Sequence, residues 1–467
     1  MKIQQTYIFV FILQIFITAS ALAAILWSLA VAADYIPFLA LLVLSIFFSV
    51  SIYISSSNIK LNIDKSACLI SIFITWFMLI FMGAIPFYVM FPEKNIEDLI
   101  FLSISLTSTF GLWLQYPILF SHEFIIWQSL LQWLGGLITI LIASFLVEFI
   151  LTKNKQDTEY FNFENLKILI LFYIIITFVF AAIFFCYDKY SIDQALRLSM
   201  ALISTSNSFN LDGSILINEN FSFKIFMIIA MIFGSLSISM HYKSFNYGIL
   251  SYFKNSNFIS VVLFFFLIVL IISIFASNET KIPILSMFID ILFLVVSFIT
   301  TTGLIPQNLY NYGFLFDFLM FLVIFTLIGG AVNSTTGGLK ASRVIFVLKF
   351  IYRELYKLAN PRVIMSKENL SLDDNTSRIF LFCILFLFSV LLLSLLLSLN
   401  NVNFVESFFI IISSITNSGV GLINIAEINY FPESFFEKLI IFIALLFGRI
   451  EVFFIMLFSS SYFWKHR

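Results

Sequence analysis

The chain has 467 residues, of which 61% are hydrophobic and 11% are charged, and its formal net charge is -1. A soluble domain carries about a quarter charged residues, so this composition excludes a soluble chain and indicates a polytopic membrane protein. The near-neutral charge gives no reason to expect a nucleic-acid partner. The three cysteines, Cys68, Cys186 and Cys383, are too far apart in sequence for a metal or redox motif.

The apolar runs of the chain predict where it crosses the membrane. The N-terminal apolar run, residues 7–33, is longer than the core of a signal peptide, so we predict a retained membrane helix. A helix needs about 20 apolar residues to span a bilayer. Candidate spans are 7–33, 36–55, 67–91, 121–150, 166–187, 222–250, 257–277, 313–353, 377–399 and 434–463. Shorter segments that we expect to be re-entrant half-helices are 98–110, 192–205, 288–301 and 404–416.

A repeated design follows the first two spans. Each unit has a span, a short helix, a polar loop and another span, which predicts four pseudosymmetric units around an axis. The loops, called first to fourth below, are LTSTFGL (106–112), STSNSFN (204–210), ITTTGL (299–304) and ITNSGVGL (415–422). The expected fold is therefore an all-α polytopic membrane protein with two leading helices and four helix–pore helix–filter loop–helix units. The expected boundaries are 1–60 for the leading helices and 61–155, 156–255, 256–360 and 361–467 for the units.

The placement of charge predicts the orientation. With both termini in the cytoplasm, eighteen Lys and Arg residues fall in cytoplasmic segments and six in outer segments, while Arg449 falls within the membrane. This bias agrees with the positive-inside rule. The outer segments are acidic, which would concentrate cations at the mouth of a pore, although ordinary solvated loop charge explains the same pattern.

The residue types of the four loops suit a cation. Backbone carbonyls replace the hydration shell of an ion in potassium channels, and Ser and Thr add hydroxyl oxygens. Glycine permits the backbone angles that such a loop needs, and the C-terminal end of each short helix favours a cation. The third loop, Thr300 to Gly303, fits this description best. The alternative is that the loops are small-residue patches where membrane helices pack closely.

A polar break interrupts the span at 313–353. The sequence GGAVNSTTGGLK, Gly329 to Lys340, leaves backbone groups unpaired, so it should be buried in protein or line a wet cavity. We call it the polar loop, and we expect it to be a mobile gate that partly occludes the path on the cytoplasmic side of the filter. The expected gate residues are Gly329, Gly330, Asn333, Ser334, Thr335, Thr336, Gly337, Gly338 and Arg449.

Arg449 lies deep in the last span, where an arginine is costly. Glu451, two positions on, lies on a different helix face and is not a clean partner. A fixed positive charge in a cation path would act as a barrier or a gate element. The alternative is a structural tie to backbone carbonyls or to a neighbouring helix.

Several segments together resemble the TrkH/KtrB family of bacterial potassium transporters, in its TrkH branch. They are GGAVNSTTGGLKASRVIFVLK, IIWQSLLQWLGGLITIL (125–141), LLFGRIEVFFIMLF (445–458), residues 64–89 and SISMHYKSF (237–245). The resemblance implies potassium uptake at the bacterial inner membrane, a homodimer and a cytosolic nucleotide-binding regulatory subunit of the TrkA type. It implies no cofactor apart from K+ as the transported ion.

The family pattern also implies the filter residues. They are Ser108, Thr109, Phe110, Gly111, Ser206, Asn207, Ser208, Thr301, Thr302, Gly303, Asn417, Ser418 and Gly419, with K+ at Thr109, Ser206, Asn207, Thr301, Thr302, Asn417 and Ser418. Two loops depart from the pattern. In the first, Gly111 stands one step late after Phe110, and in the second no glycine is present. We therefore expect a filter that also passes Na+.

Two other classes of function are weighed against a passive pore. A secondary transporter coupled to sodium or protons buries ionisable residues near the midplane, where this sequence offers only Arg449 and Glu451. An enzyme is not expected, because no paired carboxylates or nucleophile constellation falls within the membrane. The basic stretch Lys340 to Arg378 suits either a soluble partner or lipid headgroups.

Overall fold

The computed structural model describes residues 2–56, 65–112, 121–151, 163–187, 190–207, 216–217, 220–248, 283–311, 315–360, 373–428 and 430–450. Within these residues the fold is helical, with one short parallel pairing of two strands, β1 and β2. Six described helices are long and apolar enough to cross a membrane by length and composition. The predicted all-α polytopic fold is confirmed.

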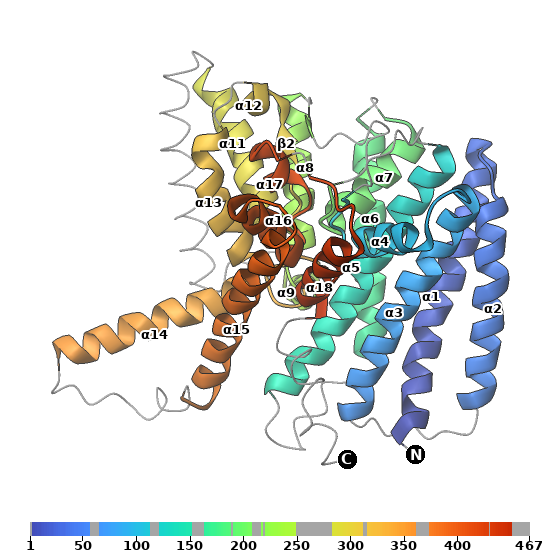
Figure 1. Ribbon diagram of the computed structural model, residues 1–467, viewed down its shortest axis with the longest axis horizontal. Coiled ribbons are helices and arrows are strands. Elements are labelled where there is room, and N and C mark those ends of the chain that lie inside the picture. Colours follow the sequence, from blue (N-terminus) through green and yellow to red (C-terminus); the bar gives the residue numbers. More distant parts are fainter. Residues whose placement is uncertain are drawn as a thin grey trace.

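The two leading helices and the first unit occupy one side of the bundle (Figure 1). The leading helices are α1 (Lys2–Val31) and α2 (Ile36–Ser56), and the first unit is α3 (Lys65–Met90), α4 (Ile96–Thr107) and α5 (His122–Leu151). The second unit is α6 (Phe163–Phe185), α7 (Ile192–Ile203), α8 (Phe221–Ser235) and α9 (Ile238–Tyr247), with β1 (Leu216–Ile217) between α7 and α8.

The third unit is described as α11 (Ile284–Ile299), β2 (Ile305–Pro306), α12 (Gln307–Asn311), α13 (Leu315–Ile328) and α14 (Ala341–Ala359). The fourth is α15 (Asp373–Ser398), α16 (Phe404–Thr416), α17 (Gly421–Ile425) and α18 (Phe435–Ile450). The predicted span 257–277 and the last part of the span 434–463 lie outside the described residues.

The four predicted half-helices are present as α4, α7, α11 and α16. Local sequence explains where α7 begins, since Ser191 and Gln194 form a capping box that satisfies the first free N–H groups of the helix. All four half-helices end inside the bundle, and most residues of their last turns are buried among apolar side chains of neighbouring helices. Their C-terminal ends are therefore shielded from lipid by the other helices.

Two predicted spans are wrong in part. The span 222–250 is broken at Leu236, whose extended backbone separates α8 from α9, and the carbonyl of Ser235 accepts the N–H of Ala331 in the polar loop instead, at 3.0 Å. The span 313–353 ends as α13, since α14 projects sideways from the bundle and none of its residues is buried (Figure 1). Its four Lys and Arg residues make α14 amphipathic rather than uniformly apolar.

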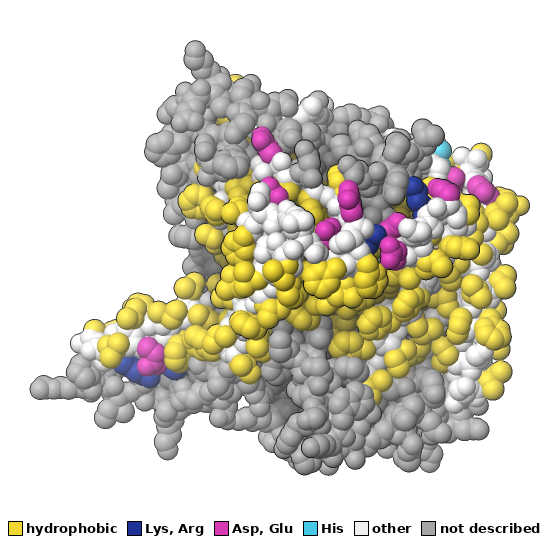
Figure 2. Space-filling model, in the orientation of Figure 1, with side chains coloured by type: hydrophobic (Ala, Val, Ile, Leu, Met, Phe, Trp, Pro, Cys, Tyr) yellow, Lys and Arg dark blue, Asp and Glu magenta, His cyan; other side chains and the backbone are white. Residues whose placement is uncertain are grey.

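The surface shows the same division between polar and apolar zones. Hydrophobic side chains form a broad band around the face shown in Figure 2, and acidic side chains gather above it. The N-terminal end of α1 lies at the opposite end of the molecule from these acidic groups (Figure 1). This band is the zone that a bilayer would cover.

Candidate functional site

All four half-helices end in the same turn. The residue after the last helical turn has a positive φ in each unit: 61° at Thr109, 54° at Thr205, 56° at Thr301 and 50° at Asn417. The next N–H then reaches back five residues to the helix, as from Phe110 to the carbonyl of Ser105 at 2.9 Å. This is the left-handed ending common at helix C-termini, where glycine is the usual residue. Thr or Asn is held there instead because the surrounding bundle fixes the turn.

The shared turn corrects the expected position of the first glycine. Gly111, Gly303 and Gly419 each follow the left-handed residue by two positions and have φ of 69°, 75° and 71°. Gly111 is therefore in register and not one step late, and Phe110 takes the place of Thr302. Counting positions from the end of the threonine run was misleading, because one residue of that run forms the left-handed turn. In the second loop the glycine position falls on Asn207, while Ser208 lies outside the described residues.

A serine in the last turn of three half-helices holds the chain beyond the turn. Ser105 donates to the carbonyl of Leu112 at 3.0 Å, and Ser297 accepts the N–H of Leu304 at 2.7 Å. Ser413 donates to the carbonyl of Gly419. The second half-helix has Ala201 at this position, which has no hydroxyl. The second loop thus lacks both the glycine and the serine tie of the other three.

The loops lie against one another. A Cβ atom on Gly303 would collide with the carbonyl oxygen of Ser418, and one on Gly419 would collide with the side chain of Asn207. Glycine is therefore required by close approach as well as by φ at both positions. The second, third and fourth loops meet directly, and their described Ser, Thr and Asn residues are buried.

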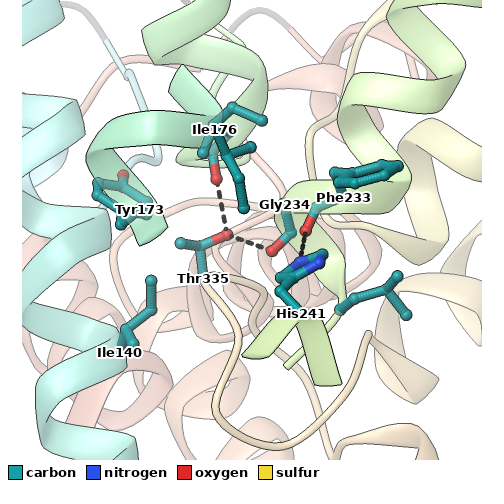
Figure 3. A pocket seen from close by; sticks show the side chains of 9 residues that line it. Ile140, Tyr173, Ile176, Phe233, Gly234, His241 and Thr335 are labelled. Atoms are coloured by element: carbon teal, nitrogen blue, oxygen red, sulfur yellow. Dashed lines mark hydrogen bonds between the residues drawn. The ribbon is translucent and has the colours of Figure 1, made fainter. Parts of the chain in front are cut away.

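The polar loop lies against the ends of these half-helices. The hydroxyl of Thr335 donates to the carbonyls of Ile203 and Gly234, at 3.1 and 3.0 Å, in the second unit (Figure 3). The N–H of Gly337 donates to the hydroxyl of Thr301 in the third unit, at 3.0 Å. A side chain on Gly337 would collide with the carbonyl of Thr416 in the fourth unit. Three of the four units thus contact this one segment.

Internal hydrogen bonds brace the polar loop. The hydroxyl of Thr336 lies 2.8 Å from that of Ser334 and accepts the N–H of Gly330 at 3.2 Å. Lys340 is buried, and its ammonium donates to the carbonyl of Thr336. Lys340 was not among the expected gate residues, since the sequence marked it only as the end of the polar loop and the start of a basic stretch. The four glycines serve close packing here; Gly329 and Gly338 also have positive φ.

Arg449 connects the first unit to the polar loop. It is buried on α18, and its Nε donates to the carbonyl of Ser108 at 2.8 Å, while Nη2 contacts that carbonyl and the hydroxyl of Thr109. Its Nη1 donates to the carbonyl of Thr335 at 2.6 Å. The guanidinium therefore bridges the first loop and the polar loop. These bonds are the tie to backbone carbonyls that was the alternative interpretation of Arg449. The predicted neighbour Glu451 lies outside the described residues.

A small cavity adjoins the polar loop behind Thr335 (Figure 3). Tyr173, Phe233 and His241 line it, and the His241 ring stacks on Phe233 and bonds to its carbonyl at 3.0 Å. The break between α8 and α9 borders the same space. The polar loop thus has apolar space on one side and the half-helix ends on the other.

The chemistry of the site is that of oxygen ligands. The buried loops of the four units carry carbonyl and hydroxyl oxygens, and no group of three or more His, Cys, Asp or Glu side chains forms among the described residues. Such oxygens suit a dehydrated alkali cation. Thr205 was not among the residues expected from sequence, although it occupies the same left-handed position as Thr109. Its equivalence to Thr109, which the 96-residue spacing would have revealed, follows from the shared turn.

Comparison with known proteins points to one family. The protein-family model described as "TrkH: Cation transport protein" matches residues 316–465. An uncharacterized cation transporter of Methanocaldococcus jannaschii is 28% identical over 449 residues, which cover 91% of this chain and 89% of the relative. The Trk system potassium uptake protein TrkH of Escherichia coli is 25% identical over 414 residues, 84% of each chain. The crystal structure of the potassium transporter TrkH from Vibrio parahaemolyticus has the same fold, with a TM-score of 0.83 at 19% identity over 99% of both chains.

Proposed function

We propose that this chain belongs to the TrkH family of cation transport proteins and that it takes up K+ across the cell membrane through a gated pore. The relatives of known function are potassium uptake proteins. One observation of this structure carries the proposal: polar residues at the ends of four re-entrant helices are joined by the polar loop and Arg449. A packing patch between membrane helices would not need four copies of one strained turn.

The four turns are the proposed ion filter. Oxygen atoms of Thr109, Thr205, Thr301 and Asn417 and of the residues after them replace the water of the ion. K+ is the transported substrate and not a resident cofactor. The filter is least regular at Asn207, and for that reason we propose that it also passes Na+.

The polar loop is the proposed gate, with Arg449 as its electrostatic partner. In this arrangement the loop contacts the ends of the half-helices, and Arg449 places a positive charge beside the first loop. Opening requires the bonds of Thr335 and Gly337 to break and the loop to move away. The cavity behind Thr335 is the space nearest to that movement.

We propose that the protein acts without catalytic chemistry, as a multi-pass protein of the bacterial inner membrane with cytoplasmic termini and the unit boundaries given above. Its assembly is a homodimer that binds a cytosolic nucleotide-binding subunit of the TrkA type. The exposed apolar residues of α14, such as Leu348, Leu355 and Leu358, support a covering by a partner subunit or lipid. The names of the relatives place them in a Trk system, which supports a multi-component assembly.

Growth of potassium-uptake-deficient cells on limiting K+ tests the function. Cells that express this chain should grow where the parent strain does not, and cells that carry the empty expression vector should serve as the control. Repeating the experiment with Na+ varied, and measuring ion flux in vesicles at fixed pH and Na+ gradients, separates passive flux from coupled transport. No rescue with correctly inserted protein would contradict the proposal.

A further inference from the structure

Two buried ion pairs occupy equivalent places at the outer end of the bundle. Lys438 of α18 pairs with Asp98 of α4 at 2.5 Å, with Glu97 3.5 Å from the same ammonium. Lys224 of α8 pairs with Asp290 of α11. Each lysine lies ten residues before the glycine that packs on the half-helix of its own unit, and each aspartate lies eleven residues before the residue with positive φ in the turn. Each pair therefore joins the inner helix of one unit to the half-helix of another.

Among the described residues, only one of the two inner helices has a charged side chain that also bonds to the far end of the partner half-helix. On α18, Arg449 donates to the carbonyl of Ser108 at the end of α4, while Lys438 holds Asp98 near its start. The intervals are eleven residues on α18 and ten on α4, about 16 and 15 Å at 1.5 Å per residue. The two helices are thus parallel neighbours that are linked by side-chain bonds at both ends. The position on α8 that corresponds to Arg449 is Ser235, which carries no charge.

The outer pair fixes how far α18 can slide along α4. Lys438 and Asp98 are 8% and 6% exposed, so a shift of one turn, about 5.4 Å, would leave two buried charges without partners. That cost is large compared with the loss of a single neutral hydrogen bond. The position of Lys438 therefore determines where Arg449 lies relative to the first loop.

We propose that Lys438 is a positioning residue, which holds Arg449 beside the first loop through its ion pair with Asp98 at the outer mouth. The inference deepens the proposed function, because Arg449 acts there as a barrier to cations. It also predicts that two similar ion pairs, Lys438–Asp98 and Lys224–Asp290, differ in function. The pair of Lys224 and Asp290 is similarly buried, with Asn308 rather than a second carboxylate beside it, but has no arginine at the far end of its helix.

Cation flux into vesicles tests the inference, with each variant normalised to the amount that elutes as folded protein. Lys438→Met should raise basal flux several-fold, as is expected of Arg449→Ala, and should add nothing in the Arg449→Ala background. The matched control Lys224→Met should leave basal flux close to that of the parent. The exchange Lys438→Asp with Asp98→Lys should restore low flux if the pair itself does the positioning. Low flux in Lys438→Met beside a leaky Arg449→Ala would overturn the inference and leave the proposed function standing.

A second measurement does not depend on whether the arginine is a barrier. With Cys68, Cys186 and Cys383 replaced by serine, Arg449→Cys offers one thiol whose rate of modification by a methanethiosulfonate reagent reports its surroundings. Adding Lys438→Met should change that rate several-fold, and adding Lys224→Met should not. Equal rates in both would show that Lys438 does not position this part of α18, whatever the flux of Arg449→Ala.

Discussion

The N–H of Gly337 donates to the hydroxyl oxygen of Thr301 across 3.0 Å, which ties the polar loop directly to the third loop. This bond joins a proposed gate residue to a proposed ion ligand. The proposed gate and the proposed filter therefore share this hydroxyl oxygen. The consequences of this and neighbouring contacts can be measured one at a time.

Thr301→Val removes the acceptor and keeps the shape of the side chain. A buried N–H left without a partner costs about 1–3 kcal/mol, so the closed arrangement is weakened and basal flux should rise by about tenfold, equivalent to about 1.4 kcal/mol. Thr326→Val on α13 is the control, because that hydroxyl bonds only within its own helix, to Val323 at 2.8 Å. An equal rise in both variants would assign the effect to general loosening.

Arg449→Ala should raise flux through the pore, because it removes a buried positive charge together with its bonds to Ser108 and Thr335. Arg449→Lys separates the two effects, since it keeps the charge but cannot form the same fork of donors. Flux in reconstituted vesicles should follow the order Ala above Lys, with the parent lowest. Unchanged or lower flux in Arg449→Ala would remove the arginine from the role of a barrier.

Deletion of part of Gly329–Gly338 should leave a leaky pore, because the segment that contacts three half-helix ends is then too short to reach them. Gly337→Ala is a milder version, since its Cβ would collide with the carbonyl of Thr416 and push the loop away. Efflux from loaded vesicles at zero potential measures both. A tightly closed pore in the deletion variant would refute the gate.

Asn207→Gly should sharpen the preference for K+ over Na+, because it gives the second loop the residue found at the equivalent place in the other three. A change of about 1.4 kcal/mol in relative ion stabilisation corresponds to a tenfold change in the permeability ratio. Adding Ala201→Ser, which restores the missing hydroxyl, should increase the effect. Ala195→Ser, buried earlier on α7, is the control. A constant ratio in all variants would mean that the second loop does not select.

Ser297→Ala should lower thermal stability, since it leaves the N–H of Leu304 without its acceptor. The expected loss is about 1–3 kcal/mol, typical of a buried unsatisfied donor. Ser286→Ala, near the exposed start of the same helix, should have little effect. Melting of the detergent-solubilised protein compares the two. Equal melting temperatures would show that the serine tie adds little to the third loop.

Hydropathy and residue spacing alone located most of the helices and all four half-helices of this protein, and they located the polar loop. These features follow from local physics: a bilayer demands about 20 apolar residues, and a helix that ends within a membrane needs polar residues to satisfy its backbone. Arg449 was identified for the same reason, because a single arginine in an apolar span is costly wherever it points.

The tertiary structure decided the register and the partners. Sequence spacing placed Gly111 one step late, because it cannot show which threonine adopts the left-handed turn. It continued the span past Lys340, although α14 leaves the bundle, and it gave no indication that Lys438 pairs with Asp98. Pairs such as Lys438 and Asp98 are 340 residues apart, so only the folded chain brings them together. Long-range packing determines which oxygen atoms lie opposite one another, and local sequence does not predict it.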